Sequence, residues 1–486
     1  MKSRHITLLL LAAMLASNLA ACGGDASTGN NIDTGAATGE TDAAETTDDG
    51  LLHDDLGNIR FDGEEFNMWL SYDELVGYDV EETTGDVFDD AVYARNMAVE
   101  ERLGVKLVYT YSGHPFSGTG YALGCQDIRS HVMSGDTTYD VYQQVQNGDV
   151  GGLIDDGIFV DWYDVPNIDL TKDYWYKNAI ENINYGDRLY RVVGYYENAI
   201  LAATNCLFFN KRIFDENQVE YPYAEALAGT WTIDKLMKIA AQTTADLNGD
   251  TTLDRTVDQF GYIGRNYNTA PALFIALGGD CITADENNMP KDVVMTERNS
   301  DIIDRLLALN NPTEGLEIIN DNGEMIQLFH DSHAATAHGE LRYCTVAYRD
   351  MKDDFGFVPY PKFDEKQESY YSYIRGSAPL SYIPVTNTGK NLEMTGAVLE
   401  VMACESYNRV VPAYVDLALT VKATRDTESE QMVPIILESA SFYDHVLVNF
   451  DVNNCHIKQS TLATEYAAYT GYMEELIARL AKTYTK

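Results

Sequence analysis

The chain has 486 residues, and its 76 Asp and Glu residues against 34 Lys and Arg residues give a formal net charge of −42. This balance argues against a nucleic-acid-binding protein, which needs clustered basic side chains to replace counterions. It also disfavours a highly anionic ligand, although a local pocket can differ from the surface as a whole. The length exceeds what one hydrophobic core usually serves, so we expect two lobes.

The first twenty-two residues have the pattern of a secretory signal. Lys2 and Arg4 form a short basic head, residues 8–15 are apolar, and Leu-Ala-Ala-Cys ends at Cys22. Such a segment is too short to span a membrane, which takes roughly 20 apolar residues. The Leu-Ala-Ala-Cys ending resembles the lipobox of bacterial lipoproteins, although a chance Cys in an ordinary signal is the alternative. We expect removal of residues 1–21 and a lipid anchor on Cys22, which places the protein on the extracellular face of the cell membrane.

Residues 22–58 form the predicted tether. From Gly23 to Asn58 there are nine Asp and Glu residues, no Lys or Arg, and many small polar residues. Such a segment buries too little apolar surface to offset its ordering entropy, and its like charges keep it extended. We expect a disordered spacer between membrane and domain.

The first expected elements form a βαβ unit. A strand is predicted at residues 65–70. A helix is predicted to follow, with Asp86 as its N-cap and Gly104 at its end. A strand with alternating apolar residues is predicted at 105–111. This order favours parallel strands and an α/β fold. The later elements, in chain order, are a helix at 127–133, strands at 139–142 and 189–193, an apolar run at 199–209, helices from 210 and over 232–244, a strand at 355–359, and helices at 394–404 and 462–480.

An oxygen-rich loop predicts a structural Ca²⁺ site. Oxygen ligands at alternate positions of one tight loop suit a hard cation, and Asp258 can close the shell. Thr251 stands where such loops have Gly, and Val257 where they have Glu; a solvated acidic turn is the alternative. The candidate ligands are Asp246, Asn248, Asp250, Thr252, Asp254 and Asp258.

Signals for other chemistry are weak or absent. His330, His333 and His338 could bind Zn²⁺, but surface or helix-face histidines are the preferred interpretation. The run Gly118–Gly124 has the wrong spacing for a dinucleotide loop, and neither a P-loop nor a GxSxG elbow occurs. We assign no catalytic residue and no catalytic cofactor. The six cysteines after Cys22 leave disulfides open, and 33 Tyr residues suit recognition of ligands such as sugars.

An ordered series of segments resembles the extracellular solute-binding proteins of family 1, the receptors of bacterial ABC importers, of which maltose-binding protein is a distant member. The resemblance covers residues 59–486, through segments such as TGDVFDDAVYARNMAVEERLGVKL, YDVYQQVQNGDVGGLIDDGIFVDW, LFFNKRIF followed by GTWTIDKL, DDFGFVPYPKFDE and GAVLEVMACESYNRVVPAYVDLAL.

The resemblance implies two α/β domains joined by a multi-crossing hinge, with a ligand cleft between them. It places lobe 1 at residues 59–200 plus 357–405 and lobe 2 at residues 201–356 plus 406–486. The crossings are expected near 199–205, near Phe357 and after Cys404.

Carried over by position, the resemblance implies twelve ligand-binding residues in loops that face the cleft. The implied function is a monomeric receptor that passes a carbohydrate or oligosaccharide to ABC permease subunits. A sensing or adhesive lipoprotein of the same fold and a glycoside-processing surface enzyme are the alternatives. The twelve residues are Tyr72, Asp73, Gln143, Gln144, Glu197, Asn198, Tyr267, Asn268, Arg342, Tyr343, Arg375 and Ser377.

Overall fold

The computed structural model describes residues 50–71, 77–420, 427–442, 452–467 and 470–485. The chain divides into residues 1–53 and a compact unit of residues 54–486. The predicted signal, Cys22 and most of the predicted tether lie outside the described residues. Among the helices that the structure describes, none combines the length and apolarity needed to cross a membrane.

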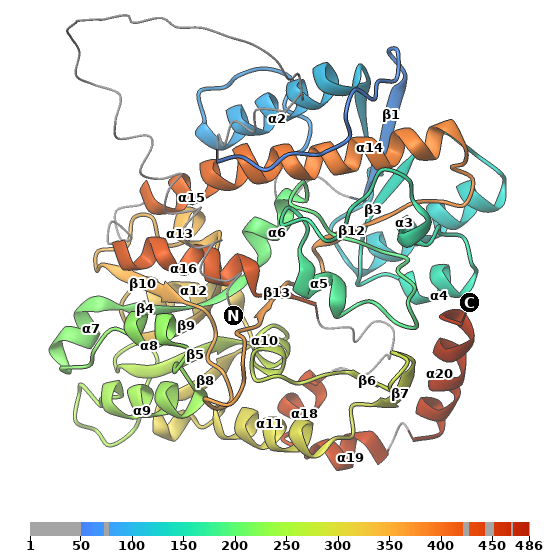
Figure 1. Ribbon diagram of the computed structural model, residues 1–486. Helices are drawn as coiled ribbons and strands as arrows, with labels where there is room; N and C mark the ends of the chain where they lie inside the picture. Colours follow the sequence, from blue (N-terminus) through green and yellow to red (C-terminus); the bar gives the residue numbers. More distant parts are fainter. Residues whose placement is uncertain (1–49, 72–76, 421–426, 443–451, 468–469, 486) are drawn as a thin grey trace, which may run out of the picture. The chain divides into compact units, whose positions relative to one another are not determined.

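A four-stranded sheet organises the first lobe (Figure 1). It contains β1 (Glu65–Leu70), β2 (Lys106–Tyr111), β3 (Val141–Val145) and β12 (Pro379–Tyr382), in the order β12-β3-β1-β2. The first three strands are parallel, whereas β12 is antiparallel to β3. Because the order reverses at β1, right-handed connections place α2 (Val87–Leu103) and α3 (Gly118–Met133) on opposite faces. Helix α14 (Lys390–Glu405) packs beside α2.

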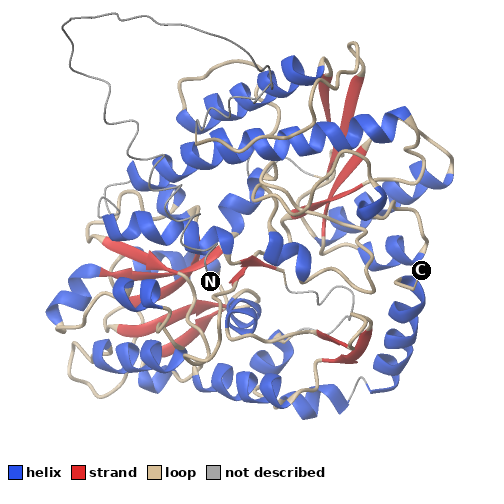
Figure 2. Ribbon diagram, viewed as in Figure 1, coloured by secondary structure: helices blue, strands red, loops and turns tan. Residues whose placement is uncertain are grey.

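A five-stranded sheet organises the second lobe (Figure 2). Its order is β10-β4-β9-β5-β8, with α9 (Ile233–Thr243), α12 (Asn322–His330) and α16 (Thr427–Glu438) packed against it. Strand β9 is parallel to β5 and antiparallel to β4. The strands are β4 (Asn205–Asn210), β5 (Phe260–Arg265), β8 (Leu316–Ile319), β9 (Ala334–Glu340) and β10 (Phe355–Val358).

The remaining elements connect or cover the two sheets. The short strand pairs are β6 (Ile282–Ala284) with β7 (Pro290–Val293) and β11 (Ser372–Tyr373) with β13 (Ala440–Ser441). The other helices are α4 (Val150–Asp155), α5 (Lys177–Glu181), α6 (Asn198–Ala203), α7 (Lys211–Glu216), α8 (Tyr223–Ala228), α10 (Thr269–Ala276), α11 (Glu297–Ala308), α13 (Tyr343–Val346), α15 (Val411–Thr420), α18 (Asn453–Lys458), α19 (Leu462–Ala467) and α20 (Thr470–Thr483).

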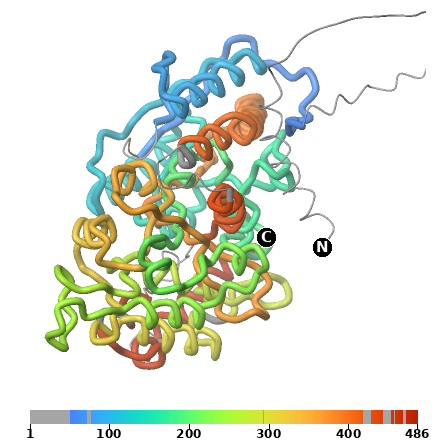
Figure 3. Tube along the Cα trace, turned by 90° about the vertical axis from the view of Figure 1, so that its left-hand side faces the viewer, coloured from blue at the N-terminus to red at the C-terminus, as the bar shows by residue number. Residues whose placement is uncertain are grey.

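The chain passes between the lobes in three places. The first passage leads from α6 into β4, and the second runs alongside it, with Ile374 bridged to Thr204. The third is helical, because α14 continues through a π-helical turn, Ser406–Val410, into α15. In Figure 3 the blue and cyan trace of β1–β3 and the green and yellow trace of β4–β9 occupy separate regions. Phe357, the predicted return point, pairs with Phe208 inside β10, so the chain rejoins the four-stranded sheet only at β12.

The first helix begins and ends where its capping residues predict. The Asp86 carboxylate accepts hydrogen bonds from the Phe88 and Asp89 amides at 2.9 and 3.1 Å. Gly104 ends the helix with φ of 65°, a left-handed conformation that glycine adopts without strain. The predicted unit of strand, helix and strand is thereby confirmed as β1–α2–β2.

Two expected elements differ in the structure, the helix at 127–133 and the strand at 189–193. The helix begins earlier than predicted, at Gly118, as α3. The glycine run forms the first turns of α3, where a Cβ on Gly120 would lie 1.8 Å from the Pro115 carbonyl oxygen; close packing therefore accounts for this glycine. The predicted strand at 189–193 is wrong: Val192 forms only an isolated bridge with Ser381 of β12. Leu189, Val192 and Val193 are fully buried, so this apolar run reflects burial without a continuous ladder.

The cysteines within the described residues are buried and form no disulfide: Cys125, Cys206, Cys281, Cys344, Cys404 and Cys455. Cys206 and Cys344 lie in apolar surroundings, and burial raises the pKa of both thiols. These side chains act as small apolar groups in the cores of the two lobes.

Candidate functional site

The passages between the lobes lie at the carboxyl ends of the parallel strands. Asn205, the first residue of β4, pairs with Glu340 at the end of β9. Pro379, the first residue of β12, likewise pairs with Val145 at the end of β3. Ligands of open α/β sheets bind outside these strand ends. The polar residues at these two edges are therefore the first candidates for a site.

At the edge of the first sheet, the Glu197 carboxylate is the centre of a buried polar network. It accepts a hydrogen bond from the Tyr78 hydroxyl and one from the Ala199 amide at 3.3 Å. In the orientation that satisfies both ends of its amide, Gln143 donates to Glu197 Oε2 at 3.0 Å and accepts from the Ser381 hydroxyl at 2.7 Å. The network joins β3, β12 and the start of α6, so it bridges a strand end and a passage between lobes.

Burial controls the protonation of this network. Desolvation raises the pKa of Glu197 to about 8, despite the hydrogen bonds from Tyr78 and Ala199 and the nearby Arg95 charge, which lower it. Arg95 is itself fully buried, and it donates to the Ser406 hydroxyl at 3.2 Å in the π-helical turn. Near neutral pH the Glu197 carboxyl is therefore largely protonated, and the network links α2 to the helical passage.

At the edge of the second sheet, three arginines surround one carboxylate. Glu340 has no exposed side-chain surface, and Arg342 Nε donates to its Oε2 at 2.7 Å. Arg375 Nη1 lies 3.4 Å and Arg265 Nη1 3.9 Å from Glu340 Oε1. We call this group the arginine cluster: Arg265, Arg342, Arg375 and Glu340. Its members come from β5, the start of α13, the second passage and β9.

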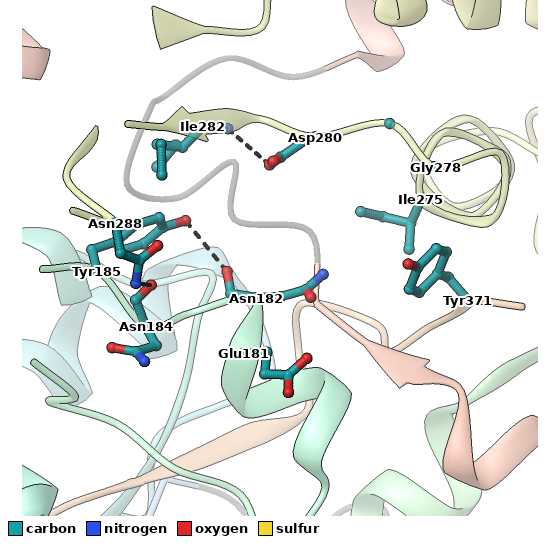
Figure 4. A pocket seen from close by; sticks show the side chains of 12 residues that line it. Glu181, Asn182, Asn184, Tyr185, Ile275, Gly278, Asp280, Ile282, Asn288 and Tyr371 are labelled. Carbon is teal, nitrogen blue, oxygen red and sulfur yellow. Dashed lines mark hydrogen bonds between the residues drawn. The ribbon is translucent and has the colours of Figure 1, made fainter. Parts of the chain in front are cut away.

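A pocket of about 260 Å³ lies between the lobes and next to the second passage (Figure 4). In the figure Asn184, Tyr185 and Asn288 lie together on one side, whereas Ile275 and Tyr371 lie on the other. The Asn288 amide donates to the Asn184 carbonyl at 3.0 Å, which ties the two lobes together there. The full lining comprises Glu181, Asn182, Asn184, Tyr185, Ile275, Gly278, Gly279, Asp280, Ile282, Ala284, Asn288 and Tyr371.

The pocket offers groups suited to polar uncharged ligands. Amides, carboxylates and tyrosine hydroxyls can exchange hydrogen bonds with hydroxyl groups, and an aromatic face can cover a ring. The side-chain oxygen of Asn184 is buried without a hydrogen-bond partner among the described residues, although its amide nitrogen donates to the Tyr163 hydroxyl at 2.9 Å. A buried acceptor of this kind is normally satisfied by a bound molecule or water.

The structure brings some of the sequence-predicted ligand residues together. Gln143 and Glu197 meet in one network, and Arg342 and Arg375 meet at Glu340. Gln144 points to the other side of β3, where its amide donates to the Tyr121 carbonyl at 3.0 Å. Tyr72 and Asp73 lie outside the described residues.

The remaining predicted residues have other partners or surroundings. Asn198 donates to the Gly77 carbonyl at 3.1 Å, and Ser377 is buried in the second passage. Tyr267 is 63% exposed, whereas Asn268 is buried at the start of α10. Tyr343 is buried, and its hydroxyl donates to Asn322 at 3.2 Å.

Sequence reasoning missed the residues of the pocket. Glu181 ends α5, Ile275 lies in α10 and Tyr371 precedes β11. The others lie in the segments 182–185 and 278–288, where no motif or periodicity marks them. The pair of amides at Asn182 and Asn184 next to Tyr185 was the available signal, but such residues are common in turns.

The predicted cation loop uses its carboxylates to organise its own backbone. Asp246 accepts from the Gly249 and Thr251 amides, both at 2.7 Å. The buried Asp258 accepts from the Leu247 and Asp254 amides, both at 2.8 Å. In their present arrangement no three His, Cys, Asp or Glu side chains of the described residues form a group that could hold a metal ion, so a cation in this loop requires its carboxylates to turn toward one point.

The three histidines have separate partners, and the preferred interpretation as surface or helix-face residues is wrong for His338, which is fully buried in a strand. His338 is buried in β9 beside the Tyr360 hydroxyl, and burial lowers its pKa to about 3. His333 lies 3.2 Å from the Asp258 carbonyl, and His330 lies beside Asp331. They do not converge on one point.

No protein-family model matches the sequence, and no curated protein matches it significantly. Solved structures do resemble it. One is the cyclic α-maltosyl-1,6-maltose-binding protein from Arthrobacter globiformis, with a TM-score of 0.53 and 13% identity over 86% of this chain and 100% of that chain. Another is UgpB from Mycobacterium tuberculosis in complex with glycerophosphocholine, with a TM-score of 0.53 and 11% identity over 86% of this chain and 99% of that chain.

A third similar structure is a cyclo/maltodextrin-binding protein complexed with maltotetraose, with a TM-score of 0.52 and 12% identity over 87% of this chain and 96% of that chain. At these identities the likeness concerns the fold. The chain therefore has the two-lobed α/β fold of periplasmic solute-binding proteins.

Proposed function

We propose that the chain is a receptor of the extracellular solute-binding family 1 that binds a carbohydrate or oligosaccharide and delivers it to the permease subunits of an ABC importer. The observation that carries the proposal is the pocket between the lobes, lined by amides, carboxylates and tyrosines from both of them. Two proteins of similar fold are named for binding maltose-type saccharides, which supports a sugar ligand.

A ligand held between the lobes would favour one arrangement of the hinge. A solute that contacts both lobes binds the closed arrangement better than the open one and shifts the population toward it. A permease can then recognise the closed receptor. We also propose that the receptor is a monomer held on the extracellular face of the cell membrane by a lipid on Cys22.

Addition of the cognate saccharide should raise the melting temperature. A ligand at 100 times its dissociation constant stabilises the fold by about 2.7 kcal/mol.

Tyr371→Ala should lower saccharide affinity about tenfold, which corresponds to about 1.4 kcal/mol, because it removes an aromatic face from the pocket. Thermal-shift screening followed by calorimetry measures both effects.

The matched control is Tyr472→Ala, because this tyrosine is 38% exposed on α20 and does not line the pocket. It should leave affinity unchanged. If no saccharide shifts the melting temperature while a peptide or amino acid does, the fold stands and the sugar assignment is wrong. Turnover of the saccharide panel would instead favour the glycoside-processing alternative.

We further propose that the loop of residues 246–258 binds Ca²⁺. The hydrogen bonds from Thr252 hold the pKa of Asp250 below its ordinary value, so this exposed carboxylate is charged at neutral pH. Each carboxylate has about four acceptor positions, so internal hydrogen bonds leave capacity for a cation.

Calcium added to chelator-treated protein should raise the melting temperature, and Asp250→Ala should abolish this shift. Asp136→Ala is the control, because Asp136 accepts from the Thr138 amide and hydroxyl in the same way as Asp250 does from Thr252. Calorimetric titration measures the binding directly. An absence of heat, with the same melting temperature with and without calcium, would leave the loop as an acidic turn.

A further inference from the structure

We infer that the solute is an anionic saccharide, whose carboxylate or other acidic group binds the arginine cluster at the edge of the second sheet. This inference rests on the proposed function and specifies the ligand class of that receptor. The overall charge of −42 would by itself favour neutral ligands. The arginine cluster at the hinge is positively charged, whereas the chain as a whole is negatively charged.

The arginine cluster carries more positive than negative charge. Three guanidinium groups, which stay protonated at any physiological pH, surround the single carboxylate of Glu340. Glu340 is the one carboxylate paired with Arg265, Arg342 and Arg375 in the described part of the chain. Two positive charges therefore remain without a neutralising partner.

Arg375 has hydrogen-bond donors to spare. Its Nη1 donates to Glu340, but its Nε and Nη2 are buried and have no acceptor among the described residues. A guanidinium group has five N–H donors in a planar fork that matches the two oxygens of a carboxylate. Because an unsatisfied buried donor is costly, these atoms are suited to a ligand oxygen.

The cluster stays open to solvent and lies at the hinge. The Arg265 and Arg342 side chains are 26% and 28% exposed, whereas Arg375 is 12% exposed. Arg375 comes from the second passage, and its guanidinium lies 5.7 Å from the ring centroid of Phe116, which precedes α3 in the first lobe. An anion bound here therefore lies where both lobes meet, as a ligand that drives closure requires.

The test is binding of size-matched saccharides to the purified protein by calorimetry. The panel contains neutral oligosaccharides, uronate-containing oligosaccharides, and sulfated and phosphorylated sugars. An anionic saccharide should bind, and Arg375→Gln and Arg342→Gln should each weaken it at least tenfold. The class of saccharide that binds most tightly identifies the acidic group that the cluster recognises. Affinity should also fall as salt concentration rises.

Two further variants separate charge from folding. Glu340→Gln removes the competing carboxylate, so it should strengthen binding of the anion, an effect that a purely structural role would not produce. Arg212→Gln is the control, because Arg212 pairs with Glu216 and Asp353 on the surface of the second lobe. It should leave affinity unchanged. Melting temperatures confirm that each variant is folded.

The outcomes distinguish the two proposals. If only neutral saccharides bind, and Arg375→Gln and Arg342→Gln bind them as well as the original chain does, the receptor function stands and the anionic ligand class is overturned. If no saccharide of any kind binds, the proposed function fails and this inference fails with it. Tight binding of an anionic saccharide that is lost in both arginine variants supports both.

Discussion

Replacing Glu197 by Gln should remove much of the decrease in the free energy of unfolding that we expect between about pH 4.5 and pH 8. The carboxyl is 1% exposed, and its pKa is raised to about 8 from an ordinary value of 4.5. The folded state therefore holds a proton that the unfolded state has released in this range. Stability from this group is complete below pH 4.5 and is lost as the pH rises through 8.

The expected contribution is about 5 kcal/mol across that window, since each pKa unit corresponds to about 1.36 kcal/mol. The unfolding free energy of the Glu197→Gln variant should still decrease to some extent with pH. Burial also raises the pKa of Glu400 to about 7 and that of Asp140 to about 6, and both shifts have the same sign. Denaturant unfolding at half-unit pH steps measures the slope.

Glu101→Gln is the control for charge removal, because Glu101 is exposed on α2. It should leave the pH dependence unchanged. If Glu197→Gln has the same slope as the original chain, Glu197 is ionised in the folded state throughout the range. The hydrogen bonds from Tyr78, Gln143 and Ala199 would then outweigh its burial.

Gly396→Ala should destabilise the fold by about 3 kcal/mol or more. Gly396 is buried in α14, and a Cβ there would lie 1.8 Å from the Pro166 carbonyl oxygen. The obstacle is a backbone atom of a segment that hydrogen bonds hold against α14. The Asn167 side-chain amide donates to the Glu393 carbonyl at 2.9 Å, and the Asp169 backbone amide donates to the Glu400 carboxylate at 3.2 Å. The helix must shift, which costs more than alanine gains in helix propensity. Chemical unfolding measures the loss.

The matched control is Gly471→Ala in α20. A Cβ at Gly471 would meet no atom within 4 Å, so alanine should leave stability unchanged or raise it by a few tenths of a kcal/mol. If the two substitutions change the free energy of unfolding equally, the segment around Pro166 does not hold α14 at a fixed distance. Because α14 leads into the helical passage, ligand affinity should be compared in any folded variant.

Local signals in the sequence predicted the elements whose ends depend on nearby residues. Asp86 and Gly104 bound the first helix because a capping carboxylate and a left-handed glycine act within a few residues. The apolar spacing near the C-terminus was read as one helix, whereas the structure has α19 and α20, with residues 468–469 outside the described residues. The length predicted two lobes, and the resemblance added the expectation of a multi-crossing hinge with a ligand cleft between them.

Only the tertiary structure decided which polar residues meet. The three arginines of the cluster come from different parts of the chain: the end of β5, the start of α13 and the second passage. No spacing in the sequence predicts that Arg265, Arg342 and Arg375 all pair with Glu340. The raised pKa of Glu197 likewise depends on burial by segments distant in the chain.

The sequence by itself determined the acidic charge and the first parallel strands, because composition and short-range patterns suffice for these. The export signal stays a prediction. The pocket, the return to the first sheet at β12 and the arginine cluster came from long-range packing. Burial and the proximity of charges arise only when distant segments meet, and they control the protonation and binding chemistry of each side chain.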